Sequence, residues 1–175
     1  MERTEIEDIF RNSNDNDELF DAFQFALKSN INEIELYKIL LANPALSEDE
    51  ICMYTDKIAK EFKQHSYSVF MWTAKLFEPL TYKIESLEKS FYYFRKAAQN
   101  NPTNYIPYIE AMNLFNYEIE MELNARIIKF VEDSVRHVNR KSKVYLKLAE
   151  HYKLVENFEL QKKYELLAQK SKERE

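Results

Sequence analysis

Glycine is absent from the 175 residues of this chain. Glycine is the residue that most easily adopts a positive φ, and its missing side chain lets a phosphate group approach the backbone closely. Without it, the tight turns of β-hairpins lose their preferred residues. The phosphate-binding loop, the dinucleotide fingerprint and the nucleophile elbow also lose a residue that each requires. The absence argues against β-rich folds and against several common classes of enzyme.

Cysteines, metal-ligand patterns and long apolar runs are also scarce. Cys52 is the single cysteine, so neither an intramolecular disulfide bond nor a cysteine-based metal cluster can form. None of the three histidines has an acidic residue three positions before it, which removes the Glu-x-x-His pattern of metal sites in helical bundles. The longest apolar stretch, residues 69–77, is interrupted by Lys75 and is too short to span a membrane. We expect a protein that is not an enzyme and that has no cofactor, no metal and no membrane segment.

The charged residues are unevenly distributed along the chain. Hydrophobic residues make up 45% of the sequence and charged residues 31%, which suits one soluble domain with a sizeable core. The net charge of −5 divides into −8 for residues 1–80, −2 for residues 81–122 and +5 for residues 123–175. The first ten residues carry four acidic side chains and one arginine, unlike the basic start of a secretory signal. We therefore expect a cytoplasmic location.

Residues that start and stop helices divide the chain into about ten helical stretches. Ser47 and Glu50 have the spacing of a capping box, and Asp17 is a candidate N-cap. Asparagine tolerates the left-handed conformation that can end a helix, and six asparagines stand where helices should stop: Asn30, Asn43, Asn100, Asn101, Asn139 and Asn157. The connections are short, so neighbouring helices should pack antiparallel as helical hairpins. The sequence predicts an all-α fold with helices at about residues 2–11, 17–30, 33–42, 47–63, 66–77, 83–99, 104–121, 124–138, 142–155 and 158–172.

A regular spacing of small, aromatic and proline residues appears near the middle of the chain. Ser90, Phe94, Ala97 and Pro102 are separated by four, three and five residues. Small residues let two helices approach closely, an aromatic residue fills the gap between them, and proline ends the second helix. This spacing resembles the second helix of a tetratricopeptide repeat. Counterparts of the first-helix pattern and of a further second helix are Tyr108, Ala111, Met112 and Phe115, then Tyr145, Leu148, Ala149 and Tyr152, then Leu160, Tyr164 and Leu167.

The resemblance implies a right-handed solenoid of stacked helical hairpins, best matched over residues 83–170. Residues 81–175 then form the repeats, and residues 1–80 form irregular or degenerate helix pairs of the same single domain, residues 1–175. An irregular helical bundle is the alternative. The residues that the resemblance places in the packing between helices are Ser90, Phe94, Ala97, Pro102, Tyr108, Phe115, Tyr145, Leu148, Ala149, Tyr152 and Tyr164.

In proteins of this family the first helices of successive pairs line a concave groove that binds a peptide or a partner helix. The resemblance thus implies a non-catalytic adaptor, scaffold or chaperone-like protein. Asn113, Lys143 and Lys147 fall at positions where some members hold a peptide carboxylate, although Glu110 would oppose an anion. The expected groove residues are Ile109, Glu110, Asn113, Asn116, Lys143, Leu146, Lys147, Glu150 and Lys153.

The basic C-terminal third supports a second hypothesis. Within 22 residues, only Glu132 and Asp133 oppose seven cationic side chains, and such a cluster could contact the phosphates of a nucleic acid. Self-association is a third hypothesis, in which the acidic half of one copy meets the basic end of another. The seven cationic residues are Arg126, Lys129, Arg136, Arg140, Lys141, Lys143 and Lys147.

Overall fold

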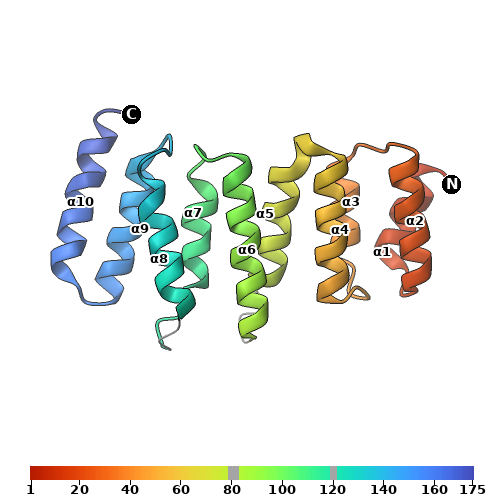
Figure 1. The fold of residues 1–175 in the computed structure, drawn as a ribbon, viewed down its shortest axis with the longest axis horizontal. Helices are drawn as coiled ribbons and strands as arrows, with labels where there is room; N and C mark the ends of the chain where they lie inside the picture. Colours follow the sequence, from red (N-terminus) through yellow and green to blue (C-terminus); the bar gives the residue numbers. More distant parts are fainter. Residues whose placement is uncertain (79–82, 119–121) are drawn as a thin grey trace. The chain divides into compact units, whose positions relative to one another are not determined.

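The computed structural model describes residues 1–78, 83–118 and 122–175, and this part of the chain is helical and contains no strand (Figure 1). The predicted all-α class is therefore confirmed. Two short 3₁₀ turns, η1 (Lys63–His65) and η3 (Met112–Leu114), accompany the α-helices. The α-helices are α1 (Arg3–Asn12), α2 (Asn16–Lys28), α3 (Ile34–Leu41), α4 (Glu48–Glu61), α5 (Ser66–Phe77), α6 (Ile84–Asn100), α7 (Ile106–Ala111), α8 (Glu122–Ser134), α9 (Lys141–Leu154) and α10 (Phe158–Lys172).

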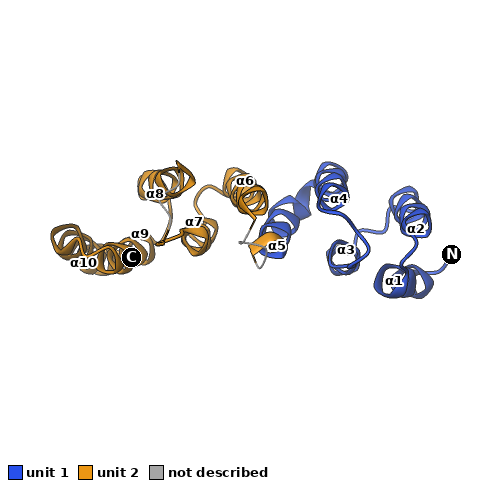
Figure 2. Cartoon of the chain, turned by 90° about the horizontal axis from the view of Figure 1, so that it is seen from below, with its two compact units in different colours: residues 1–76 blue, residues 77–175 orange. Residues whose placement is uncertain are grey.

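The chain divides into two compact units, residues 1–76 and residues 77–175 (Figure 2). The single domain over residues 1–175 and the repeats from residue 81 stay predictions. No helix in the described ranges is long and apolar enough to cross a membrane.

In unit 1 (residues 1–76), α1 and α3 lie on one side and α2 and α4 on the other (Figure 2), and α1 contacts both α2 and α3. Aromatic side chains form the centre of this unit. Phe23 packs edge-on against Tyr54, with ring centroids 4.6 Å apart, and also against Tyr37 at 6.1 Å. Tyr37 is fully buried, and its hydroxyl donates a hydrogen bond of 2.7 Å to the carbonyl oxygen of Ile31. This core is apolar with its polar atoms satisfied, as a stable interior requires.

Two helix starts in unit 1 test the capping predictions. The capping box at the start of α4 is confirmed, because Ser47 accepts from the Glu50 backbone N–H and Glu50 accepts in return from Ser47. The assignment of Asp17 as an N-cap was wrong: Asp15 caps α2 by accepting a 2.9 Å hydrogen bond from the Asp17 backbone N–H. The helix begins two residues earlier than expected for an Asp17 cap, so Asp17 lies in the first turn, where its charge favours the helix N-terminus.

Two residues of the described chain adopt a positive φ, Asn30 at 52° and Glu156 at 58°. Each follows a helix in a Schellman turn: the N–H of Ile31 bonds to the Ala26 carbonyl after α2, and the N–H of Asn157 bonds to the Tyr152 carbonyl after α9. Asn30 therefore has the left-handed role that the sequence predicts. The other five asparagines named for this role, Asn43, Asn100, Asn101, Asn139 and Asn157, do not adopt a positive φ. Asn157 instead caps α10, where its side chain accepts from the Leu160 backbone N–H.

In unit 2 (residues 77–175), α6 and α8 lie on one side and α7 and α9 on the other (Figure 2), with α7 in contact with α6, α8 and α9. Helix α9 makes its most extensive packing with α10. The interior is built on residues with no exposed surface, among them Ser90, Phe94 and Ala97 of α6 and Leu148 of α9. Serine and alanine at such points allow close approach of helices around the phenylalanine ring.

The predicted helix over residues 104–121 is wrong in its second half, and its last three residues lie outside the described part of the chain. Helix α7 ends at Ala111 and continues only as the 3₁₀ turn η3, after which Phe115 is extended, with φ −66° and ψ 122°. The cause is a tertiary contact. The Asn124 side chain donates 2.7 Å to the Asn116 carbonyl oxygen and accepts 3.1 Å from the Asn116 N–H, which takes these groups out of helical hydrogen bonding.

Candidate functional site

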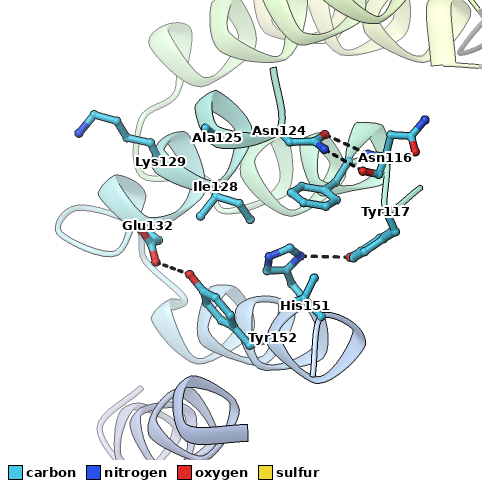
Figure 3. A pocket seen from close by; sticks show the side chains of 11 residues that line it. Asn116, Tyr117, Asn124, Ala125, Ile128, Lys129, Glu132, His151 and Tyr152 are labelled. Carbon is cyan, nitrogen blue, oxygen red and sulfur yellow. Dashed lines mark hydrogen bonds between the residues drawn. The ribbon is translucent and has the colours of Figure 1, made fainter. Parts of the chain in front are cut away.

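A pocket of about 540 Å³ opens in unit 2 between α8, α9 and the segment that follows η3 (Figure 3). Most of its wall is apolar or aromatic, with a few polar groups, which is the usual composition of a binding site. The lining residues are Phe115, Asn116, Tyr117, Asn124, Ala125, Ile128, Lys129, Glu132, His151, Tyr152 and Val155.

One wall of the pocket depends on the Asn124–Asn116 pair. Asn124 lies in the first turn of α8 and is only 8% exposed. Its two hydrogen bonds to the Asn116 backbone fix the non-helical segment, as Figure 3 shows. The Asn116 side chain in turn accepts 2.8 Å from the Glu118 N–H. The segment is therefore held with Phe115 and Tyr117 in the pocket wall.

His151 of α9 lies against these two aromatic side chains. The ring is 4% exposed, and its Nδ1 is 3.2 Å from the Tyr117 hydroxyl. Phe115 meets it edge-on with ring centroids 4.5 Å apart. Burial lowers the pKa of His151, and the nearby charge of Glu132 opposes this only in part. The imidazole is therefore neutral at neutral pH, and its Nε2 makes no hydrogen bond to any described residue.

Glu132 of α8 brings a carboxylate to the opposite side of the pocket. Its Oε1 accepts two hydrogen bonds, 3.0 Å from the Tyr152 hydroxyl and 2.8 Å from the Tyr164 hydroxyl. The two tyrosine rings are stacked, 5.4 Å apart with an interplanar angle of 4°. Burial, and then the bond to Glu132, raise the pKa of Tyr152 to about 12, and the pKa of Tyr164 is raised for the same reasons. Both phenols thus remain protonated and serve as donors.

The remaining charges near the pocket leave Glu132 without a cationic partner among the described residues. Lys129 is at the rim, with a side chain 79% exposed, and its Nζ lies 3.4 Å from Asp133 Oδ2 on the same helix. Glu150 adds a second negative charge close to Tyr117, whose pKa is raised first by burial and then by that charge. Among the lining residues, the charged group that faces the interior is therefore the carboxylate of Glu132, although the pocket lies in the basic third of the chain.

The predicted groove residues of the α7 region fall in different surroundings. Asn116 lines the pocket through its backbone contacts with Asn124. The Asn113 amide donates to Glu110 at 3.3 Å and to Glu78 at 3.4 Å, so two carboxylates surround the position expected to hold a peptide carboxylate. Ile109 is half-buried on the same short helix.

The predicted groove residues of α9 face mostly elsewhere. Lys143 and Leu146 line a separate pocket of about 350 Å³ between the start of α9 and the end of α10. Lys147 and Glu150 form an ion pair at 3.9 Å, and Lys153 is exposed. The structure thus does not bring the nine predicted residues together around one pocket.

The predicted packing residues divide into three groups by burial. Besides the four residues already named, Tyr108, Ala149 and Tyr164 are buried, Phe115, Tyr145 and Tyr152 are half-buried, and Pro102 is exposed. Phe115 and Tyr152 also line the pocket. Sequence reasoning identified these two as packing residues and did not select Tyr117, Glu132 or His151. The three lie on separate elements, and no local pattern relates them.

No protein-family model, no curated protein and no solved structure matches this chain. Within the described ranges, no group of three or more histidine, cysteine, aspartate or glutamate side chains is placed to hold a metal ion. What the pocket offers is a fixed carboxylate, aromatic faces and a neutral imidazole, which are groups that can bind a ligand by hydrogen bonds and apolar contact.

Proposed function

We propose that this chain is a cytoplasmic, non-catalytic protein-interaction module, an adaptor, scaffold or chaperone-like protein that binds a peptide or a partner helix. The observation that carries the proposal is the apolar surface around the pocket mouth. Tyr117 and Val155 line the pocket and are 48% and 42% exposed, and the adjoining turn carries Leu154 and Phe158 at 66% and 60%. Large apolar side chains exposed beside a preformed pocket are typical of sites that bind protein partners.

The packing of unit 2 supports a tetratricopeptide-like arrangement for this module. Helices α7 and α9, the first helices of two successive pairs, contact each other directly. Ser90, Phe94 and Ala97 are buried at the spacing typical of a second helix. In such an array the first helices present a continuous surface to a partner, and the pocket opens along one of them, α9.

The protonation states in the pocket support binding rather than acid–base catalysis. A catalytic base works best with a pKa near the working pH. The pKa values of Tyr152 and Tyr164 are raised instead, which makes these phenols permanent donors to Glu132. The complete absence of glycine points the same way, because the phosphate and nucleophile motifs of many enzymes need it.

Nucleic-acid binding through the basic C-terminal third is less well supported by the geometry. Arg126 is paired with Glu88 at 2.7 Å, and Lys129 and Arg136 both lie within 4.0 Å of Asp133. These neighbours offset part of the positive charge that phosphate binding would use. A mobility-shift titration at low salt tests this alternative, and we expect no retarded complex.

Selection from a displayed library of random peptides tests the proposal directly. The complete folded chain should enrich a family of related peptides. Filling the pocket mouth by Ala125→Trp should weaken their binding at least tenfold, because Ala125 lies on the exposed side of α8 and lines the pocket. As a matched control, Leu166→Ser removes an exposed apolar side chain of α10 and should leave binding unchanged. A selection that enriches no peptide would contradict the proposal.

A further inference from the structure

The carboxylate of Glu132 is unusually well prepared to receive a positive charge. Both hydroxyl donors, from Tyr152 and Tyr164, bind the same oxygen, Oε1. The second oxygen, Oε2, makes no hydrogen bond or ion pair with any described residue. The two tyrosines therefore fix the position of the carboxylate while one of its oxygens stays available. A fixed carboxylate with an open oxygen loses little entropy when a donor arrives.

The walls around this carboxylate suit a flat cation. Tyr152 reaches Glu132 from below in Figure 3, while Ile128 lies above and the His151 ring faces them from the other side. Phe115 and Tyr117 extend the aromatic surface beyond His151, at centroid distances of 4.5 Å and 5.7 Å from its ring. Aromatic faces attract cations through the negative charge density above the ring, most strongly where water is excluded.

No positive charge inside the pocket competes for this place. The buried imidazole of His151 is neutral at neutral pH because burial lowers its pKa. Lys129, the cationic lining residue, is directed to solvent and lies beside Asp133. Glu150 also lies near Tyr117, but it is exposed and paired with Lys147, so Glu132 is the carboxylate that sets the charge of this site. By the same electrostatics, an anionic group such as a peptide carboxylate is repelled.

We propose that this pocket receives an arginine side chain of the bound peptide, with the guanidinium group donating to Glu132 Oε2 and stacking on the aromatic wall. The inference rests on the proposed protein-binding function and names the side chain that the site selects. Arginine fits better than lysine because its planar, weakly hydrated guanidinium can stack on the aromatic rings while one of its N–H groups donates to Oε2.

Titration of the complete chain with a blocked arginine, N-acetyl-arginine methylamide, tests the inference by two-dimensional NMR. We expect saturable shifts at the backbone amides of Tyr117, Glu132 and His151, with a dissociation constant on the order of 1 mM for so small a ligand. The citrulline analogue has nearly the same shape but no charge, and it should bind at least tenfold more weakly. The blocked lysine should also bind more weakly than arginine.

Two matched variants separate the carboxylate's role from a general effect of charge. Glu132→Gln keeps an oxygen that can accept from the two tyrosines and should reduce arginine binding at least tenfold. Glu159→Gln removes the same charge from the exposed face of α10 and should leave it unchanged. Thermal melting should show that both variants are folded.

Three results would overturn the inference: no saturable shift at the pocket, equal binding of citrulline, or arginine binding that survives Glu132→Gln. Equal binding of lysine would overturn the choice of arginine. These failures differ from failure of the proposed function. Selected peptides that bind but contain no arginine would sink the arginine pocket alone. If the pocket binds blocked arginine but the chain enriches no peptide from the library, the protein-binding proposal alone is contradicted.

Discussion

The two units bury their tyrosines in different ways. In unit 1, the hydroxyl of Tyr37 donates to a backbone carbonyl, and its ring belongs to a closed aromatic cluster with Phe23. In unit 2, Tyr152 and Tyr164 donate to the carboxylate of Glu132 at the wall of an open pocket. The first arrangement satisfies the hydrogen-bonding need of a buried hydroxyl group, which is a structural role. The second holds an ionisable group in place beside solvent.

The acceptor of a buried tyrosine hydroxyl therefore helps to separate a structural contact from a candidate binding site. Backbone carbonyls are available in every helical core, so a tyrosine bonded to one needs no further explanation. A carboxylate that is fixed by two neutral donors and has no cationic partner is costly to keep partly buried. Such a carboxylate is retained where it binds a ligand or fixes a specific packing arrangement. Because Glu132 lines an open pocket, we favour ligand binding.

The largest expected effect is on the closed core of unit 1. Phe23→Ala should lower the free energy of unfolding by about 3–5 kcal/mol, because it leaves a cavity between Tyr37 and Tyr54. Fluorescence of Trp72, the single tryptophan, follows urea unfolding of this unit specifically. Phe20→Ala on the same helix is the control, since Phe20 is 43% exposed. It should change stability by less than about 0.5 kcal/mol. Equal effects of the two changes would contradict the described core.

A smaller loss is expected when the carboxylate of unit 2 is removed. Glu132→Ala deprives the half-buried phenol of Tyr152 and the buried phenol of Tyr164 of their acceptor. It should cost about 1–3 kcal/mol, measured by urea unfolding followed by circular dichroism. Glu132→Gln retains an acceptor and should cost less. Glu159→Ala on exposed α10 serves as the control. If Glu132→Ala is as stable as Glu159→Ala, the tyrosine–carboxylate contact is not a stabilising one.

The two left-handed turns should respond unequally to glycine. Glu156→Gly should stabilise the chain by about 0.5–1 kcal/mol, because glutamate pays a steric penalty at φ 58° that glycine avoids. Asn30→Gly should stabilise the chain less, by roughly 0.2 kcal/mol, since asparagine tolerates the left-handed region. Thermal melting of both variants decides the matter, and an equal gain at both positions would refute the steric explanation.

The smallest expected effect is a dependence of the free energy of unfolding on pH, which arises from His151 in unit 2. Burial lowers the pKa of His151 in the folded state, so between that value and the unfolded value of 6.5 the unfolded chain binds more protons. Stability from this group is therefore complete above pH 6.5 and decreases as pH falls through the folded pKa. His151→Asn, which retains a polar side chain facing Tyr117, should remove this decrease. Urea unfolding of both proteins from pH 7.5 to 5 measures it, and parallel curves would contradict the prediction.

Much of the fold could be predicted because local signals agree with the tertiary structure. The helix bounds of α5 and α10 coincide with those read from the sequence, and the capping box at Ser47 fixed the start of α4. The end of α7 could not be predicted. It depends on Asn124, a residue of the next helix, whose side chain replaces helical hydrogen bonds at Asn116.

The candidate site was less accessible to sequence reasoning for the same reason. Tyr152 was assigned to packing from its spacing, and its side chain does stack on Tyr164. Its contact with Glu132 spans 20 residues and joins two helices, so no periodic pattern indicates it. His151 lies next to Tyr152 in sequence, yet its burial against Phe115 follows only from the extended segment after η3.

Photo-crosslinking tests the central claim, that partner peptides bind at the pocket of unit 2. Benzoylphenylalanine would replace Tyr117 at the pocket mouth or Phe20, an aromatic residue of similar exposure in unit 1. Each protein is then irradiated with a library-selected peptide. The account predicts a covalent adduct from position 117, absent after Ala125→Trp, and none from position 20. An adduct from position 20 alone, or equal adducts from both, would contradict it.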